Sequence, residues 1–208
     1  MQELLNTPDD DRNEAWEDQF LLTLTEQNLR ILSPDSQAGP DGWPYLLVET
    51  TNDGEPAQKI LQWLAQRGIG LAVNPSKDAP DFTLSWGMIW NFRETGKFID
   101  RHAPLQTGSV QFSKDQMLQH GAPSAKYLPD YVKSILKDFF RDQGLHHVRI
   151  LVFTLDGKNY ELAFSLESLG KPPEKEHAGI AEALGWFLPT HYSLVLISEA
   201  NLPKFIEL

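Results

Sequence analysis

The sequence predicts an α+β protein made of two small sandwich-like units, and three observations support this prediction. Apolar residues recur at helical spacing in several segments, strand-sized apolar runs lie between these segments, and the breaker-rich stretch Gly121–Ser124 separates two self-sufficient hydrophobic patterns. We therefore expect an N-terminal α+β domain over residues 1–121 and a C-terminal domain over residues 125–208. In the second domain the expected order is α-β-β-α-β, with a mixed sheet covered by two helices.

In the N-terminal domain, helices and strands are expected to alternate. The spacing of Trp16, Phe20 and Leu24 predicts a helix around residues 11–25, with a short strand near residues 29–32. The next predicted elements are a buried strand, a helix that begins at a proline and ends at a glycine, and a further strand. These cover Tyr45–Val48, Pro56–Gly68 and Ile69–Val73, in that order.

The segment Phe82–Phe92 alternates apolar and other residues with a period of two, which predicts a long strand. We expect its apolar stripe, which includes Trp86 and Trp90, to form a core face. The alternative is an exposed aromatic platform for a ligand or partner. Ser113 and Gln116 then form a possible capping box for a short helix.

In the C-terminal domain, a strong helical stripe predicts a helix from Leu128 to Gly144. Two strands, His147–Leu155 and Lys158–Leu166, flank Asp156-Gly157, a pair that type I′ hairpin turns favour. In the second strand Glu161 and Ser165 share a face that we expect to be wet or lightly covered. A helix from Pro172 to Pro189 and a strand over Tyr192–Ile197 complete the domain.

Composition and charge exclude several classes of function. The 208 residues include no cysteine, which removes disulfides, thiolate metal sites and thiol nucleophiles, and we expect no cofactor. A net charge of −11 argues against nucleic-acid partners and anionic membranes. It fits plain solubility or a basic protein partner. The sequence shows neither a signal peptide nor an apolar run long enough to span a bilayer, so we expect a cytoplasmic protein.

No catalytic or metal-binding motif is present. The chain lacks a dinucleotide loop in the right order, a phosphate-binding loop and a nucleophile elbow. The six histidines form no metal-binding pair of the HExxH type. His146 and His147 are adjacent at an expected strand start and would point to opposite faces. The triple aspartate Asp9–Asp11 is expected to be solvated, so we assign no catalytic or metal-ligating residue.

The C-terminal half resembles the SseB-like (enhanced serine sensitivity) bacterial proteins. The resemblance rests on a helix beginning Leu128-Pro129-Asp130-Tyr131-Val132 before a central hairpin, and on a second amphipathic helix that leads into a last strand. The N-terminal half is similar through residues 58–64 and residues 70–75. The resemblance implies a bacterial module of non-enzymatic role, and it supplies no catalytic residues.

Two hypotheses about function follow. The first is a binding or regulatory module that acts through a protein interface, and one version of it is an acidic immunity or antitoxin protein that neutralises a basic toxin. The second is a small hydrolase or transferase whose site is assembled from separate loops, for instance by His102, His120 and Glu176. The candidate residues for ligand or partner binding are Trp86, Trp90, His102 and Glu161. The oligomeric state is left open.

Overall fold

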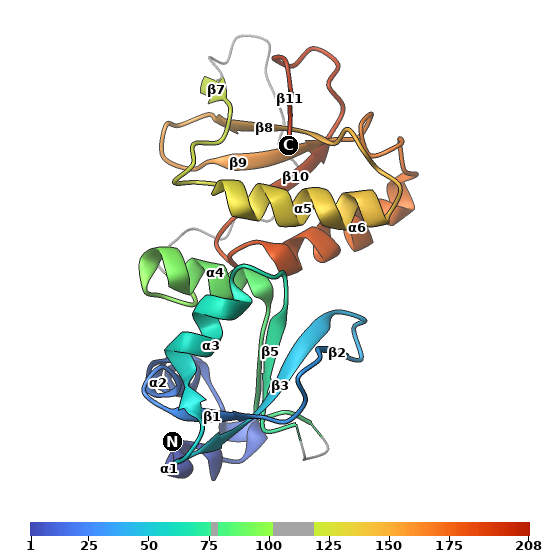
Figure 1. Cartoon of the computed structure of the whole chain (residues 1–208). Coiled ribbons are helices and arrows are strands. Elements are labelled where there is room, and N and C mark those ends of the chain that lie inside the picture. Colours follow the sequence, from blue (N-terminus) through green and yellow to red (C-terminus); the bar gives the residue numbers. More distant parts are fainter. Residues whose placement is uncertain (76–78, 102–118) are drawn as a thin grey trace. The chain divides into compact units, whose positions relative to one another are not determined.

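The structure is a computed structural model that describes residues 1–75, 79–101 and 119–208 (Figure 1). It contains helices and two mixed sheets in two compact units, Met1–Phe98 and Ile99–Leu208, so the predicted α+β class is confirmed. The division between the units precedes the predicted boundary at Gly121, because strand β7 (Gln119–Gly121) pairs with a strand of the second unit.

The first unit is a sheet with helices on one face. Its elements are α1 (Gln2–Leu5), the 3-10 helix η1 (Asp9–Asp11), α2 (Glu14–Leu24), β1 (Asn28–Ile31), β2 (Gln37–Ala38), β3 (Pro44–Thr51), β4 (Glu55–Pro56), α3 (Ala57–Leu64), β5 (Gly70–Val73), β6 (Phe82–Leu84) and α4 (Trp86–Thr95). The strand order is β4-β1-β3-β5-β6, with β2 also on β3. Strands β3 and β5 are parallel and are joined by the crossover helix α3 (Figure 1).

The strand register identifies the core face of this sheet. Leu46 pairs with Leu71, which pairs with Leu84, and paired side chains point to the same side of a sheet. Phe82 lies two residues from Leu84 and so shares that face, where its ring stacks on Phe20 of α2 with a centroid distance of 5.1 Å. Leu46, Leu71 and Leu84 are buried on this face and belong to the core of the first unit.

The predicted long strand over Phe82–Phe92 is wrong beyond Leu84. The Ser85 hydroxyl accepts a hydrogen bond from the Met88 amide and begins helix α4. Gly96, with φ 76°, ends this helix in the left-handed conformation. An N-cap serine and a C-terminal glycine thus outweigh a period-two pattern that also fits a helix.

The second unit contains the predicted α-β-β-α-β order, with two strands that were not predicted, one before it and one after it. After β7 its elements are α5 (Asp130–Asp142), β8 (Arg149–Thr154), β9 (Glu161–Ser165), α6 (Glu174–Phe187), β10 (Ser193–Ile197) and β11 (Ile206–Glu207). The strand order is β10-β9-β8-β11, β7 also pairs with β8, and only the β9–β10 pair is parallel. Helices α5 and α6 run together along one face of the sheet (Figure 1), and the Phe139 and Phe187 rings lie 4.7 Å apart between them.

The other face of this sheet is covered, so of the two states expected for this face of β9, wet or lightly covered, the wet one is wrong. Ala163 of β9 packs with Leu151, Phe153 and Phe205 in a buried cluster, against which Leu202 is also packed. The residues after β10 supply Leu202 and Phe205, and this covering segment has no helical or strand periodicity that would reveal it in the sequence. The capping box at Ser113 and Gln116 lies outside the described residues.

The hairpin between β8 and β9 does not use a type I′ turn. Its loop spans residues 155–160, and Gly157 has a positive φ of 73° whereas Asp156 does not. The Asp156 carboxylate instead accepts hydrogen bonds from the Lys158 and Asn159 amides at 2.8 Å. These bonds hold the pKa of Asp156 at about 2. The aspartate side chain therefore fixes the conformation of a six-residue loop, and the strands are joined without a two-residue turn.

Candidate functional site

The two tryptophans proposed as binding residues are core residues. Trp86 is 0% exposed, and its indole Nε1 donates a hydrogen bond to the Ala65 carbonyl at 3.2 Å. Trp90 is also buried, with its ring centroid 6.5 Å from that of Trp86. The expected core role is therefore correct, and the alternative of an exposed aromatic platform is wrong.

Glu161 is not a surface contact residue. It is 6% exposed at the start of β9, and its carboxylate accepts a hydrogen bond from the Ser193 hydroxyl of the neighbouring strand β10. A buried carboxylate bonded across a parallel strand pair serves the sheet and is not available to a partner. His102, the fourth candidate, lies outside the described residues.

The other histidines named in the sequence analysis lie apart from any candidate metal site in the described part of the chain. Within the described ranges no group of three or more His, Asp or Glu side chains could hold a metal ion. His120 and Glu176, named in the hydrolase hypothesis, are exposed on β7 and α6. His177 is partly buried and its Nε2 lies 3.0 Å from the Pro172 carbonyl at the start of α6.

A second aromatic cluster lies beside Glu161. The Tyr127 and Tyr192 rings stack 4.6 Å apart, and the Tyr192 hydroxyl donates a hydrogen bond to the Tyr127 carbonyl. Burial raises the pKa of the Tyr127 hydroxyl and lowers the pKa of His191. Both shifts keep these side chains uncharged near neutral pH, which fits a packing role for the cluster.

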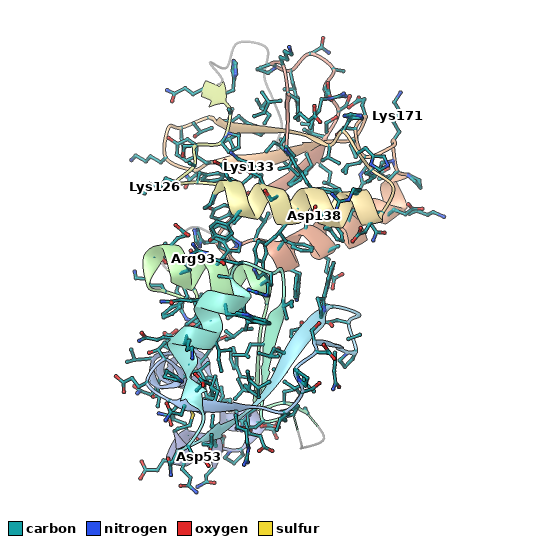
Figure 2. All side chains as sticks on the ribbon, viewed as in Figure 1. Asp53, Arg93, Lys126, Lys133, Asp138 and Lys171 are labelled. Carbon is teal, nitrogen blue, oxygen red and sulfur yellow. The ribbon has the colours of Figure 1, made fainter. Side chains whose placement is uncertain are left out.

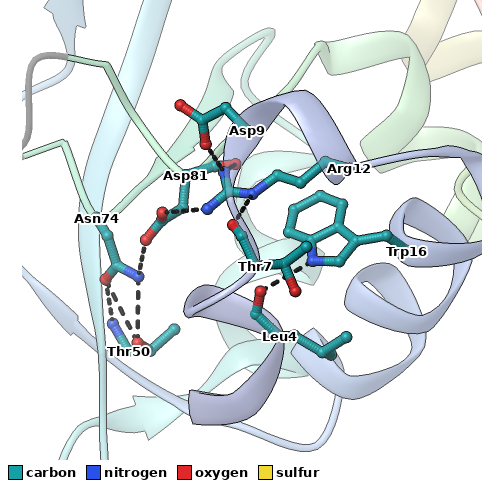
Figure 3. Close-up of polar contacts among 8 residues, drawn as sticks. All are labelled: Leu4, Thr7, Asp9, Arg12, Trp16, Thr50, Asn74 and Asp81. Carbon is teal, nitrogen blue, oxygen red and sulfur yellow. Dashed lines mark hydrogen bonds and ion pairs between the residues drawn. The ribbon is translucent and has the colours of Figure 1, made fainter.

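A polar network in the first unit joins its N-terminal segment to the sheet (Figure 3). The Arg12 guanidinium donates to the Asp81 carboxylate at 3.1 Å and to the Asp81 carbonyl at 3.2 Å. The Asn74 amide donates to the same carboxylate at 2.9 Å, and the Asn74 amide oxygen accepts from the Thr50 amide. Each polar group here is engaged by another part of the fold, so the network is structural.

An open apolar groove in the first unit has a different character. Its volume is ≈ 360 Å³, and it is lined by Ile31, Pro34, Leu46, Glu55, Lys59, Ile60 and Trp63. Leu46 and Ile60 are buried, whereas Ile31 and Trp63 are 42% and 41% exposed. Among the described lining residues, Glu55 and Lys59 alone are charged, and they form an exposed ion pair of 2.6 Å. The groove is thus an apolar hollow with one ion pair among its lining residues.

The groove exists because one end of the core face lies uncovered. Leu29 and Ile31 are two residues apart on β1 and so point to the same face of the sheet. Leu29 is 0% exposed, but Ile31 is 42% exposed. A core-face isoleucine at the uncovered end of a sheet exposes apolar surface that a partner could bury.

Trp63 forms a wall of this groove from helix α3. The Arg67 guanidinium lies over its indole ring, 4.0 Å from the ring centroid, and also donates a hydrogen bond to the Trp63 carbonyl at 3.1 Å. This cation–π contact restrains the tryptophan in its exposed position. A half-exposed, restrained tryptophan is the kind of side chain that supplies binding energy in protein interfaces.

A smaller hollow in the second unit is less suited to binding an apolar ligand. Its volume is ≈ 190 Å³, and its lining includes Lys137, Arg141, His146 and Glu207. Charges of both signs surround it. The groove of the first unit is larger and is lined mainly by apolar side chains, so it is the better candidate site.

The acidity of the chain is concentrated in the unit that carries the groove. Residues 1–98 hold 16 acidic and 7 basic side chains, a net charge of −9, whereas residues 99–208 hold 13 and 11, a net charge of −2. Asp53, close to the groove residue Glu55 in the chain, lies on the surface of the first unit (Figure 2). The unit that carries the groove is therefore strongly acidic.

Sequence reasoning missed both exposed groove residues. Trp63 could have been noticed because it is a large aromatic off the Ile60, Leu61 and Leu64 stripe of its helix. Ile31 carried no such signal, since an isoleucine in a short strand is normally a core residue.

Comparison with known proteins does not assign the chain to a family. We found no protein-family model, curated protein or solved structure that matches this chain. The resemblance to the SseB-like family therefore stays a prediction. In the described part of the chain, every helix is too short or too polar to cross a membrane.

Proposed function

We propose that this protein is a non-enzymatic binding module that holds a protein partner in the apolar groove of its first unit. The observation that carries the proposal is the pair of half-exposed side chains, Ile31 and Trp63, over a buried apolar floor. Interface cores are enriched in aromatic residues. A few clustered apolar side chains that a partner buries together supply much of the binding free energy.

The lining favours a protein partner over a small molecule. Small-molecule sites use a few convergent polar groups to fix the orientation of the ligand. Here the polar lining consists of Glu55 and Lys59, which bind each other at 2.6 Å. The groove is open and apolar, which suits a side chain presented by another protein.

The test is affinity capture with the full chain immobilised and three variants compared. Trp63→Ala and Ile31→Lys alter the groove, while Leu22→Ala removes an apolar side chain that is 62% exposed on α2 and does not line the groove. The proposal predicts a stoichiometric partner that the Leu22 variant retains and both groove variants lose. Capture that is unchanged in the groove variants, or absent with the unaltered chain, contradicts it.

A further inference from the structure

We infer that the partner contributes an extended, basic segment, which adds as a strand along the outer edge of β1 and places an apolar side chain in the groove. This inference rests on the proposed function and names the chemistry of the partner. Its evidence is the hydrogen-bonding direction of β1, the position of the groove beside that edge, and the charge around it.

The backbone of Ile31 points to an edge that no strand covers in the described part of the chain. Leu32 donates to the Leu47 carbonyl at 2.9 Å, and Arg30 is paired with Glu49 of β3. In an antiparallel pair the bonding direction alternates along the strand, so the amide and carbonyl of Ile31 face away from β3. On that side β4 pairs with Asn28 and Leu29 only.

The groove lies where an added strand would need it. The Ile31 side chain lines the groove, and side chains of neighbouring strands that lie opposite each other point to the same face. A strand bonded to the Ile31 backbone would therefore direct every second side chain to the face of the sheet on which Ile31 and Leu46 line the groove. Proteins that bind a peptide by strand addition use main-chain hydrogen bonds for affinity and a pocket for alternate side chains for specificity.

Charge favours a basic segment. Asp35 follows the lining residue Pro34, and a hydrogen bond from the Thr51 hydroxyl lowers the pKa of the exposed Asp53 carboxyl, whereas the charges of Glu55 and Lys59 offset each other in their ion pair. The nearby cations are already engaged, Lys59 by Glu55 and Arg67 by the Trp63 ring. With a net charge of −9 on residues 1–98, lysines on the partner segment would meet a negative field.

The experiment uses three synthetic octapeptides and the full chain labelled with nitrogen-15. The first peptide alternates leucine and lysine, the second replaces each lysine with glutamate, and the third is the lysine peptide with alternate backbone amides methylated. Binding is followed by the Ile31 amide and the Trp63 indole signals in NMR titrations at low and high salt. The variants Trp63→Ala and Leu22→Ala serve as groove variant and matched control.

The lysine peptide is expected to shift the Ile31 and Trp63 signals and to bind at least about tenfold more tightly than the glutamate peptide. Methylation, which removes strand hydrogen bonds, should weaken binding by about tenfold or more, and high salt should weaken it several-fold. The Leu22 variant should bind as the unaltered chain does, and the Trp63 variant should not.

Three outcomes overturn the inference: no binding of the lysine peptide at millimolar concentration, equal binding of the glutamate peptide, or indifference to methylation. None of these affects the proposed function if affinity capture still yields a partner that requires Trp63 and Ile31. If capture yields no such partner, the proposed function fails on its own test. The two results are therefore separable.

Discussion

The ion pair between Arg12 and Asp81 should stabilise the first unit far more than an exposed pair does. Arg12→Met keeps the aliphatic stem but removes the guanidinium from a carboxylate whose side chain is 2% exposed. Breaking a buried pair by removing one partner costs about 3 to 5 kcal/mol, because the remaining charge is left in a poorly solvated site. We expect a loss near the lower end, about 3 kcal/mol, since the Asn74 amide still donates to that carboxylate.

A double-mutant cycle separates the pair from its surroundings. Asp81→Asn alone should cost about 2 kcal/mol, and the double variant should cost less than the two single losses together, with an interaction energy of about 1.5 to 3 kcal/mol. Urea unfolding is followed through amide signals of β5 and β6, so that the first unit is observed by itself. The control is Arg30→Met, which breaks a 2.7 Å pair with Glu49 whose side chains are 60% and 29% exposed.

The control should lose less than about 1 kcal/mol, as exposed pairs do. If Arg12→Met costs no more than Arg30→Met, or if the cycle shows no coupling, burial is not what gives the network its strength. The structural role assigned to Figure 3 would then be refuted.

Three further predictions concern packing and pH. Gly70→Ala should destabilise the first unit by about 1 to 3 kcal/mol in urea unfolding, because its Cβ would lie 2.7 Å from the Leu84 carbonyl oxygen; Gly179→Ala in α6, where the Cβ meets open space, should cost nothing. Trp86→Ala should cost about 3 to 5 kcal/mol, whereas Trp63→Ala should cost less than about 1 kcal/mol; equal losses would contradict the assignment of core and groove. The pKa of Glu167 is held at about 2 by the Ser198 hydroxyl and the Glu199 amide, so its stabilisation is present above the unfolded pKa of about 4.3 and is lost as pH falls toward 2. In thermal unfolding, the melting temperature of Glu167→Gln should fall less between pH 5 and pH 2.5 than that of the unaltered chain. Equal falls in the two proteins would count against this linkage.

Much of the fold was accessible from local sequence signals. Helices α3 and α6 begin at prolines and carry apolar stripes, and α5 has both a proline before it and Gly144 after it. The β8–β9 pair was predicted from two apolar runs around Asp156-Gly157. These signals depend only on residues close together in the sequence, so they can be recognised without knowledge of the tertiary packing.

The errors arose where two local patterns competed. Trp86, Met88 and Trp90 alternate as in a strand, yet Trp86 and Trp90 also lie four residues apart as on a helix face. The hydroxyl of Ser85 decided between them by capping the helix. In a similar way, a longer loop held by hydrogen bonds to the Asp156 side chain forms in place of the two-residue turn expected at Asp156-Gly157.

The candidate site could not be predicted because it depends on where elements stop. Ile31 is exposed because the cover of the core face ends near it, and β4 does not pair with its backbone because β4 begins at Glu55, opposite Leu29. Glu161 is buried in a sheet whose far face is covered by the segment carrying Leu202 and Phe205. Such burial is a property of tertiary packing, which strand periodicity alone does not encode.

The most direct measurement of the central claim is amide hydrogen exchange and signal mapping of the full chain with the partner obtained by capture. The account predicts slowed exchange at the Ile31 amide and the largest signal changes at Ile31, Leu46 and the Trp63 indole, with Leu22 unaffected. Changes confined to residues 119–208, or an Ile31 amide that exchanges as fast with the partner as without it, would contradict the assignment of this groove as the binding surface.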